Sequence, residues 1–440
     1  MAMKISVIGC GYLGAVHAAS MAELGHEVIG VDTDAAKISE LAAGRAPFFE
    51  PGLPELLERT LATGRLTFTT DLSEATSADV HFLCVGTPQL VGEYAADLSY
   101  VESAFAALLE IVKPGDLIVG KSTVPVGTAE RLADDLEAKE PGATLVWNPE
   151  FLREGFAVED TLHPDRLVYG VEAGPSGERA VAVLDEVYAT ILAADTPRLV
   201  MDHATAQLVK VAANSFLATK ISFINAMAEL CERTGADVTA LADAIGMDER
   251  IGRRFLNAGL GFGGGCLPKD IRAFMARAGE LGADQTLSFL AEVDAINTRR
   301  RVRMVDLARA ESGGSFEGRK ITVLGASFKP DSDDIRDSPA LDVAEQIRRQ
   351  GAQVRVTDPA AIASARKTYP ELEYVEDVAE ALVGADLVLL LTEWRQYREL
   401  DPVAVRELVA EPRILDGRNA LDADSWRAAG WTYRALGRPH

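Results

Sequence analysis

The chain has 440 residues, enough for two or three domains with substantial cores, and 48% of them are hydrophobic and 25% charged, as in globular proteins. It carries 44 Lys and Arg against 67 Asp and Glu, a formal net charge of −23. This acidic balance argues against nucleic acid as a partner, because phosphate backbones bind basic faces.

The cysteines and histidines argue against a disulfide-stabilised protein and against a metal-binding protein. The four cysteines form no CxxC pair, so a disulfide scaffold is not expected, and the six histidines show no metal-binding spacing, so no metal site is expected. The N-terminal residues read directly into a strand, without the features of a signal peptide. No apolar run approaches the roughly 20 residues of a membrane span. We therefore expect a cytoplasmic protein that does not bind membranes.

The N-terminal part alternates strands and helices. Residues 4–32 read as strand, glycine turn, helix and strand, and further strands are expected in the segments 80–86, 116–124 and 144–151. Apolar runs separated by helical stretches predict a parallel sheet covered by helices on both faces. We expect this first domain to span residues 1–200.

A glycine motif follows the first strand. Gly9, Gly11 and Gly14 form G-x-G-x-x-G between a strand and a helix, and Asp32 ends the next strand. This context is typical of a Rossmann-type dinucleotide site, in which the glycines admit a pyrophosphate and the carboxylate binds a ribose hydroxyl. We predict NAD rather than NADP, because Asp32 would repel a 2′-phosphate. The alternative is a glycine turn that binds no nucleotide.

A second phosphate-binding string occurs at residues 115–122, GDLIVGKS. It matches the Walker A pattern, but a P-loop needs a flexible turn between its glycines and a helix after them. Here the interval is the strand core Leu-Ile-Val, and Thr-Val-Pro follows. We therefore expect no ATP site at this position.

The middle of the chain is helical. Residues 202–234 contain no Gly or Pro and repeat apolar residues at helical spacing, which predicts one helix of roughly 30 residues, closed by Gly235. More helices are expected to about residue 312, so that a central helical domain would occupy residues 201–312.

The most unusual segment of the central region is GFGGGCLPKD, residues 261–270. Three glycines precede Cys266, and Pro268 suits the first turn of a helix. Glycines allow a ligand to approach closely, and a helix N-terminus favours a thiolate, so Cys266 is predicted to be a nucleophile. The alternative is a tight loop around an inert buried cysteine.

A glycine- and serine-rich linker, residues 312–320, precedes a second alternation of strands and helices. Strands are expected in the segments 320–328, 352–359 and 381–394. This predicts a smaller Rossmann-like α/β domain at residues 313–440, without the glycine fingerprint. The two α/β domains are either distant repeats or two copies of a common architecture.

Six ordered motifs place these features in one pattern. Besides the G-x-G-x-x-G turn they are VGTP (85–88), KSTVPVGT (121–128), NPEFLREG (148–155), GFGGGCLPKD (261–270) and SFKPDSDDIRDSPAL (327–341), with Lys210 and Asn214 on the long helix. The chain thereby resembles the UDP-glucose/GDP-mannose dehydrogenase family. The resemblance implies a two-step, NAD-dependent oxidation, most directly of the C6 alcohol of UDP-glucose to UDP-glucuronate.

The resemblance also implies catalytic roles. Cys266 would trap the aldehyde as a thiohemiacetal, whose oxidation gives a thioester for water to hydrolyse. Lys210 would stabilise negative charge on the substrate oxygen, with Asn214 one helical turn away as a second donor. Asp270 would orient or deprotonate water. Thr123 and Glu150 would hold a catalytic water, and Glu154 would lie near cofactor and substrate.

Further residues are implied as ligand contacts. For NAD they are Gly9, Gly11, Tyr12, Leu13, Gly14, Asp32, Lys37, Gly86, Thr87, Ser122, Thr123, Glu154 and Arg336. For the nucleotide sugar they are Glu150, Phe151, Leu152, Glu154, Lys210, Asn214, Arg250, Phe255, Phe262, Gly263, Gly264, Cys266, Phe328, Lys329 and Arg418. Arg250 matches an arginine that reaches the partner subunit's site, which implies a homodimer or a higher oligomer.

Several alternatives stay open. Relatives acting on GDP-mannose or a UDP-N-acetylhexosamine share most motifs. A single-step hydroxyacid dehydrogenase or a non-catalytic NAD sensor would have no use for Cys266, Lys210 and Asn214 together. Singly, Lys210 could be a solvated helix lysine and Asp270 a charge at a helix start. Gly265 departs from many relatives, which have serine there, and residues 89–100 lack a common Asp-Gly turn.

Overall fold

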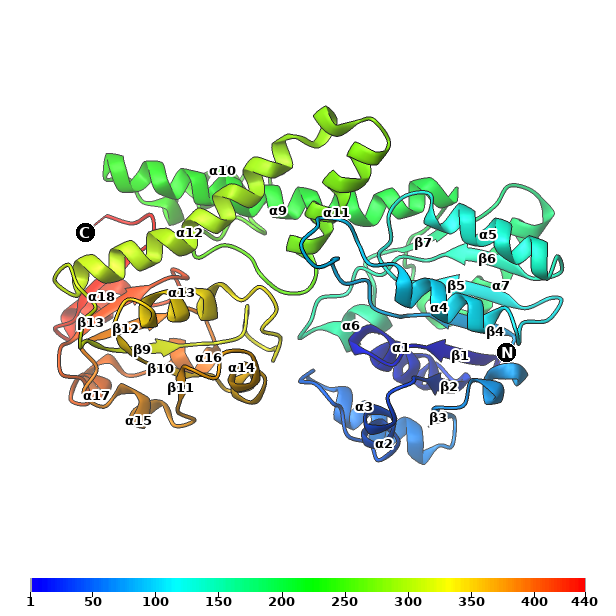
Figure 1. Cartoon of the computed structure of the whole chain (residues 1–440), viewed down its shortest axis with the longest axis horizontal. Helices are drawn as coiled ribbons and strands as arrows, with labels where there is room; N and C mark the ends of the chain where they lie inside the picture. Colours follow the sequence, from blue (N-terminus) through cyan, green and yellow to red (C-terminus); the bar gives the residue numbers. More distant parts are fainter. Residues whose placement is uncertain (1, 440) are drawn as a thin grey trace. The chain divides into compact units, whose positions relative to one another are not determined.

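The computed structural model describes residues 2–439, which form two compact units. The first contains the described residues up to Ala213 together with Ala276–Leu281, and the second contains Asn214–Met275 and the described residues from Gly282 onward. Each unit contains one sheet (Figure 1). We expected three domains, divided near residues 200 and 312, and this division stays a prediction.

The sheet of the first unit has eight strands in the order β3-β2-β1-β4-β5-β6-β7-β8. Neighbouring strands are parallel except β6 and β7, which pair antiparallel at Trp147 and Gly170. The strands are β1 (Lys4–Ile8), β2 (Glu27–Val31), β3 (Leu66–Thr69), β4 (Val80–Leu83), β5 (Leu117–Gly120), β6 (Thr144–Trp147), β7 (Leu167–Gly170) and β8 (Arg198–Met201). The expected parallel sheet is confirmed.

Helices cover both faces of this sheet, because its central strands are apolar on both faces (Figure 1). In β5, Leu117 and Val119 join one apolar cluster with α1, whereas Ile118 joins the cluster that contains Phe105 of α4 and Leu132 of α5. The helices are α1 (Tyr12–Glu23), α2 (Ala35–Ala42), α3 (Leu53–Ala62), η1 (Leu72–Ser77), α4 (Ser99–Leu108), α5 (Thr128–Lys139), α6 (Ala157–Leu162), α7 (Pro175–Val187) and α8 (Ala189–Leu192).

The long helix predicted over residues 202–234 is α9 (His203–Thr234), which has 32 residues and runs from the first unit into the second. The other helices of the central region are α10 (Val238–Gly246), α11 (Leu267–Glu280), η2 (Asp284–Leu287) and α12 (Phe289–Glu311). Within the second unit, α9 packs through Ala218 against Ile271 of α11 and Leu290 of α12. This packing holds the start of α11, where the Cys266 loop ends.

The sheet of the second unit is entirely parallel, in the order β11-β10-β9-β12-β13-β14. This is the Rossmann order 3-2-1-4-5-6, which the first six strands of the first sheet also follow. The strands are β9 (Lys320–Leu324), β10 (Gln353–Thr357), β11 (Glu373–Tyr374), β12 (Leu387–Leu390), β13 (Arg413–Asp416) and β14 (Thr432–Ala435). The remaining helices are α13 (Pro339–Arg348), α14 (Ile362–Thr368), α15 (Val378–Leu382), α16 (Arg395–Arg398), α17 (Pro402–Arg406) and α18 (Ala423–Ala428).

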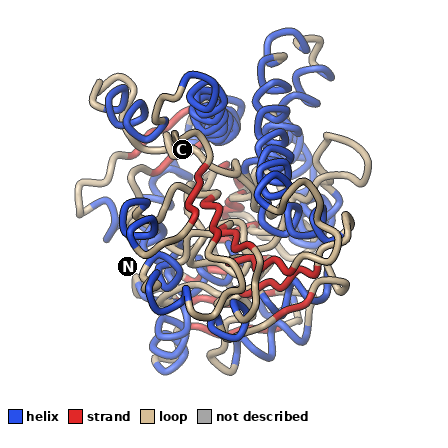
Figure 2. The backbone as a smooth tube through the Cα atoms, turned by 90° about the vertical axis from the view of Figure 1, so that its left-hand side faces the viewer, coloured by secondary structure: helices blue, strands red, loops and turns tan. Residues whose placement is uncertain are grey.

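The two sheets repeat a local turn as well as a strand order; Figure 2 distinguishes their strands from the surrounding helices. The N–H of Gly9 donates to the Val31 carbonyl at 2.8 Å, and the N–H of Gly325 donates to the Thr357 carbonyl at the same distance. Both glycines have positive φ, 89° and 110°. The second α/β domain therefore echoes the first, as the sequence indicated.

Candidate active site

The turn between β1 and α1 needs its glycines. A Cβ on Gly14 would lie 1.8 Å from the Gly9 carbonyl oxygen, and a Cβ on Gly9 would lie 2.7 Å from the Val85 side chain. At Gly11 a Cβ would meet nothing within 4 Å. Packing therefore does not require Gly11, whose missing side chain keeps the start of α1 open to a pyrophosphate.

Asp32 lies at the carboxyl end of β2 and holds this turn. Its Oδ2 accepts the Cys10 N–H at 2.8 Å and the Lys37 ammonium at 2.8 Å, and its Oδ1 accepts the Asp34 N–H. Burial acts to raise the pKa of Asp32, but hydrogen bonds from Lys37, Asp34 and Cys10 outweigh it and lower the pKa. The ionised carboxylate suits ribose hydroxyls and disfavours a 2′-phosphate, which fits NAD.

The neighbouring strands β4 and β5 end in loops that are tied together. Thr87 Oγ1 donates to the Thr123 carbonyl at 2.9 Å, and Ser122 Oγ donates to the Val85 carbonyl at 2.6 Å. These loops lie at the carboxyl edge, beside the switch point between β1 and β4, where parallel sheets bind nucleotides. The same strand excludes the P-loop, because β5 occupies the interval between its glycines and α5 begins only at Thr128.

The structure brings three of the expected residues together after β6 and on α9. Lys210 Nζ donates to Glu150 Oε1 at 2.9 Å and lies 5.6 Å from the ring centroid of Phe151. Glu150 also accepts the Leu152 N–H at 2.8 Å. The Lys210 side chain is only 6% exposed. It is therefore not a solvated helix lysine, and a buried ammonium beside a carboxylate suits charge stabilisation.

A carboxylate that the sequence did not single out organises this segment. Glu50 is buried, receives the Tyr12 hydroxyl hydrogen bond, and accepts the N–H groups of Gly155 and Ala157 at 2.7 Å each. Burial raises the pKa of the Glu50 carboxyl although these bonds oppose it. Tyr12, expected at the cofactor, thus anchors the segment that carries Glu150. Only the proximity of residues about 100 apart in the chain reveals Glu50.

In the second unit, Cys266 immediately precedes α11, as predicted, and is exposed. The other three cysteines, Cys10, Cys84 and Cys231, are buried, and burial raises the pKa of each thiol. Cys266 is therefore the thiol that a substrate can reach, and its position at a helix N-terminus favours the thiolate.

The three glycines before Cys266 are needed by the segment that packs on them. A Cβ on Gly263 would lie 2.3 Å from the Asp337 carbonyl oxygen, and one on Gly264 would lie 2.7 Å from the Phe328 ring. A Cβ on Gly265 would lie 2.2 Å from Arg336 Cζ, so a serine there would displace the guanidinium. The Gly264 N–H also donates to the Arg336 carbonyl at 2.8 Å. The structure thus gathers Phe328 and Arg336 around the cysteine loop.

Asn214 and Asp270 form a buried pair in the same unit. Asn214 Nδ2 donates to Asp270 Oδ2 at 2.6 Å, Lys269 donates to the other carboxylate oxygen, and the Asp270 N–H donates to the Cys266 carbonyl at 3.0 Å. Asp270 is 2% exposed. A surface charge favoured only by the helix dipole would not be buried in this way, so Asp270 is part of a built network.

Other predicted substrate contacts have structural partners. Arg418 donates to the carbonyls of Leu391, Gly261 and Phe328 at 2.7, 3.0 and 3.0 Å, which ties the cysteine loop to the ends of the second sheet. Phe262 is clamped by Asn297, which accepts its N–H and donates to its carbonyl. The sequence did not single out Asn297, which lies in a helix with no local signal.

The remaining predicted residues are exposed or half-buried. Arg250 is 89% exposed and pairs with Asp248 at 2.7 Å. Phe255 has a left-handed φ of 65°, unusual for a bulky residue. Lys329 lies 5.4 Å from the centroid of the Phe328 ring, and Glu154 is half-buried.

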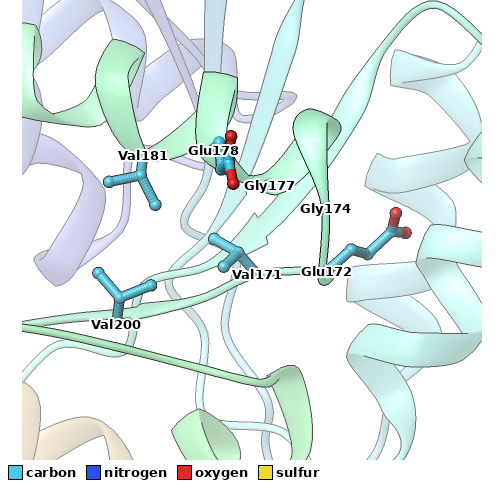
Figure 3. A pocket seen from close by; sticks show the side chains of 7 residues that line it. All are labelled: Val171, Glu172, Gly174, Gly177, Glu178, Val181 and Val200. Carbon is cyan, nitrogen blue, oxygen red and sulfur yellow. The ribbon is translucent and has the colours of Figure 1, made fainter.

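One surface hollow contains none of the predicted residues. It lies beside β7, β8 and the start of α7 (Figure 3). Its lining residues are Val171, Glu172, Gly174, Gly177, Glu178, Val181 and Val200. Valine side chains and two carboxylates do not suit a phosphate ligand, so the hollow is not a nucleotide site.

Residues 2–439 contain no helix long and apolar enough to cross a membrane, and no group of three or more His, Cys, Asp or Glu side chains placed to hold a metal ion.

Known proteins of one family are similar to this chain along nearly its whole length. Three models of the UDP-glucose/GDP-mannose dehydrogenase family match in order: the NAD binding domain over residues 3–192, the central domain over 204–299 and the UDP binding domain over 322–423. A UDP-glucose 6-dehydrogenase from Rhizobium meliloti (strain 1021) is 42% identical over 440 residues, covering 99% of this chain and 100% of its own length.

Solved structures extend the comparison. A UDP-glucose dehydrogenase from the hyperthermophilic archaeon Pyrobaculum islandicum has a TM-score of 0.90 at 39% identity, covering 100% of this chain and 98% of its own. A UDP-D-ManNAc dehydrogenase from Pyrococcus horikoshii has a TM-score of 0.86 at 26% identity, covering 99% of both chains. The chain belongs to the UDP-glucose/GDP-mannose dehydrogenase family and is an NAD-dependent dehydrogenase.

Proposed function

We propose that this enzyme oxidises the C6 alcohol of UDP-glucose to the carboxylate of UDP-glucuronate through a covalent Cys266 intermediate. The observation that carries the proposal is the exposed Cys266 at the start of α11, in a chain whose other thiols are buried. Two oxidations need a means of retaining the aldehyde between them, and a thiolate provides one. Relatives that are about 40% identical and named UDP-glucose 6-dehydrogenase support this substrate.

The reaction balances with two equivalents of cofactor. The Gly9–Gly14 turn and Asp32 would hold NAD, which would supply a hydride acceptor for each oxidation. In sum, the alcohol, two NAD⁺ and one water give the carboxylate, two NADH and three protons. Cys266 adds to the aldehyde as a thiohemiacetal, and loss of a hydride and of the hydroxyl proton makes this a thioester. Water then releases the acid and regenerates the thiol.

The other residues supply charge and position. The buried Lys210 ammonium would stabilise the developing negative charge on the substrate oxygen, and Glu150 keeps that ammonium in place. Asp270 on the first turn of α11, held by Asn214 of α9, would orient the hydrolytic water. Thr123 and Glu154 are proposed to assist through cofactor or water contacts.

GDP-mannose and UDP-N-acetylhexosamines are the alternative substrates, because the family name includes the first and a structural relative acts on one of the second. NADH formed per nucleotide sugar consumed decides among them when UDP-glucose, GDP-mannose and UDP-N-acetylmannosamine are assayed side by side. Two NADH per UDP-glucose is expected. Two per molecule of another sugar would correct the substrate, and one NADH per sugar would contradict the covalent mechanism.

We also propose that the enzyme is a homodimer or a higher oligomer. On α9 the apolar side chains Phe216, Phe223 and Leu230 are exposed and recur every seven residues, which places them along one stripe of the helix. A second copy of this chain would cover the stripe, and the exposed Arg250 would be available to the partner's substrate. A cytoplasmic location stays a prediction.

A further inference from the structure

The mechanism proposed for Cys266 and Lys210 does not use a buried lysine that follows β5. Lys121 is 7% exposed and follows Gly120 in the KSTVPVGT motif. Its N–H donates to the Leu83 carbonyl at 3.0 Å, which fixes its backbone against β4. Its ammonium donates to Asn148 Oδ1 at 2.9 Å and reaches the Tyr188 hydroxyl at 3.4 Å.

Aromatic rings, rather than an anion, surround the rest of this ammonium. Lys121 Nζ lies 5.8 Å from the ring centroid of Phe82 and 5.9 Å from that of Tyr188. Within residues 2–439 no carboxylate forms an ion pair with Lys121. An ammonium buried without an ion-pair partner costs stability, so its presence requires a reason.

The hydrogen bonds of Lys121 converge on Asn148, which begins the segment that carries Glu150. Asn148 donates its N–H to the Gly120 carbonyl at 2.8 Å and its Nδ2 to the Val168 carbonyl at 2.9 Å. Its Oδ1 accepts both Lys121 and the Tyr188 hydroxyl. Every polar atom of the Asn148 side chain is thus used, and the backbone leading to Glu150 is fixed.

Lys121 lies near a second buried lysine and its carboxylate partner. Glu150 and Lys210 form a buried ion pair, and both interact electrostatically with Lys121. The Lys121 ammonium therefore adds a positive charge near Glu150 and Lys210 in a largely dry environment. This added positive charge favours an anion, and the oxidation of an alcohol develops negative charge on oxygen.

We propose that Lys121 is a positioning residue for the oxidation, which fixes Asn148 and so Glu150, and adds positive charge near the Glu150–Lys210 pair. This rests on the proposed function of Lys210 at the substrate oxygen. The neutral form of Lys121 would still hold Asn148 but would no longer supply the charge.

The charge on Lys121 is expected to change within the pH range in which the enzyme can be assayed. Burial lowers the pKa of Lys121 to about 8. The titratable groups facing it from the packed elements are His17 on α1, Cys84 after β4, Tyr188 after α7, Glu150 after β6 and Lys210 on α9.

Three of these groups stay neutral while Lys121 titrates. Burial and the nearby Lys121 hold the pKa of His17 well below its usual value. Burial raises the pKa of Cys84 to about 12 and that of Tyr188 well above its usual value. These three groups therefore do not contribute a change of charge near pH 8 beside Lys121.

The test compares kcat of the wild type with that of Lys121→Met between about pH 6.5 and about pH 9.5, a range that brackets the Lys121 pKa of about 8. Methionine matches the four-atom apolar stem of lysine and removes the ammonium. Lys139→Met is the matched control, because Lys139 pairs with Glu110 on the surface of the same unit. We expect kcat of Lys121→Met to be at least about tenfold below the wild type at low pH. The ratio should shrink as pH rises through 8.

Two outcomes would overturn the proposal. A ratio of one at all pH values would show that Lys121 does not act on the reaction, and a large but constant ratio would show that it is only structural. Wild-type enzyme that forms no NADH from any nucleotide sugar would instead overturn the proposed function, and this proposal with it. If the wild type turns over and the ratio of the two kcat values is one or constant across the pH range, only the role of Lys121 is overturned.

Tyr188→Phe keeps the proposal testable if Lys121→Met does not fold. It removes one hydrogen-bond acceptor of the ammonium and retains the ring. Loss of that acceptor disfavours the charged form, so the alkaline decline attributed to Lys121 should move to lower pH. An unchanged midpoint with a folded variant would contradict the role given to the Lys121 charge.

Discussion

At the scale of single residues, Asp32 and Asp358 occupy equivalent positions in the two sheets but differ in their contacts. Asp32 follows β2 and Asp358 follows β10, and each accepts the N–H of the residue after a positive-φ glycine, at 2.8 and 2.7 Å. Asp358 is buried and also accepts the Ser327 hydroxyl and the Trp394 indole N–H. Only the first of the two is placed to meet a ribose, so we assign the dinucleotide to the first unit.

The role of Asp32 predicts a change in cofactor choice. Asp32→Ala should weaken NAD binding about tenfold or more, because hydrogen bonds to a charged group are worth about 1.5–3 kcal/mol, and it should reduce the preference for NAD over NADP. Titration of both cofactors measures this. Asp71→Ala, at a helix start on the surface of the same unit, is the control. An unchanged preference would show that Asp32 does not bind the ribose.

Lys121 predicts a pH dependence of stability. Its pKa falls from 10.5 to about 8 on folding, so the unfolded chain binds the proton more tightly. The cost of burying the charge is fully present below about pH 8 and is relieved as pH rises toward 10.5, which adds about 3 kcal/mol to the free energy of unfolding.

Denaturant unfolding of the wild type and Lys121→Met across this range tests the cost, because the other titrating groups are common to both proteins. The stability of the wild type relative to the variant should increase by about 3 kcal/mol between about pH 8 and about pH 10.5. A difference that does not change with pH would mean that Lys121 keeps an ordinary pKa in the folded enzyme.

At the scale of elements, the start of α11 combines a tight loop with a helix N-terminus. The loop is fixed by contacts to Gly263, Gly264 and Gly265, and by Asn297, so Cys266 is presented on a rigid support. A preorganised nucleophile needs such support from the surrounding shell.

We predict that alanine has opposite effects on stability at two glycines, one before α11 and one within it. Gly264 has φ of 83°, and a Cβ there would lie 2.7 Å from the Phe328 ring, so Gly264→Ala should lower stability by at least about 1 kcal/mol and reduce activity. Gly279 lies within α11, where a Cβ would meet nothing within 4 Å, so Gly279→Ala should raise stability by about 0.5–1 kcal/mol. Thermal unfolding and kcat compare the two. Equal effects would contradict the steric account of the loop.

At the scale of the whole molecule, the alternation of apolar strands and amphipathic helices was enough to predict both sheets, because fully buried parallel strands such as β5 and β12 read as short apolar runs. The motifs also indicated candidate residues around Cys266 and Asp32, whose roles stay predictions. The supporting residues could not be predicted, since Glu50 meets Gly155, and Asn297 meets Phe262, only after distant parts of the chain have folded.

The stripe on α9 predicts the state of association. Phe223→Glu places a charge in the middle of the exposed apolar stripe, so it should dissociate the oligomer into single chains. Light scattering after size exclusion measures the mass of each form. Glu249→Gln, on the exposed loop after α10, is the control. A wild-type enzyme that is monomeric at all concentrations would contradict the proposed oligomer and the role of Arg250 in a partner's site.

The central claim is that Cys266 carries the intermediate, and the most direct test is the uronate formed by Cys266→Ser under saturating NAD and UDP-glucose. We predict loss of net acid formation by a factor of at least about 1,000, since removal of a nucleophile commonly costs this much. NAD binding, measured by titration, should stay near the wild-type value. Acid production at the wild-type rate by this variant would contradict the covalent mechanism.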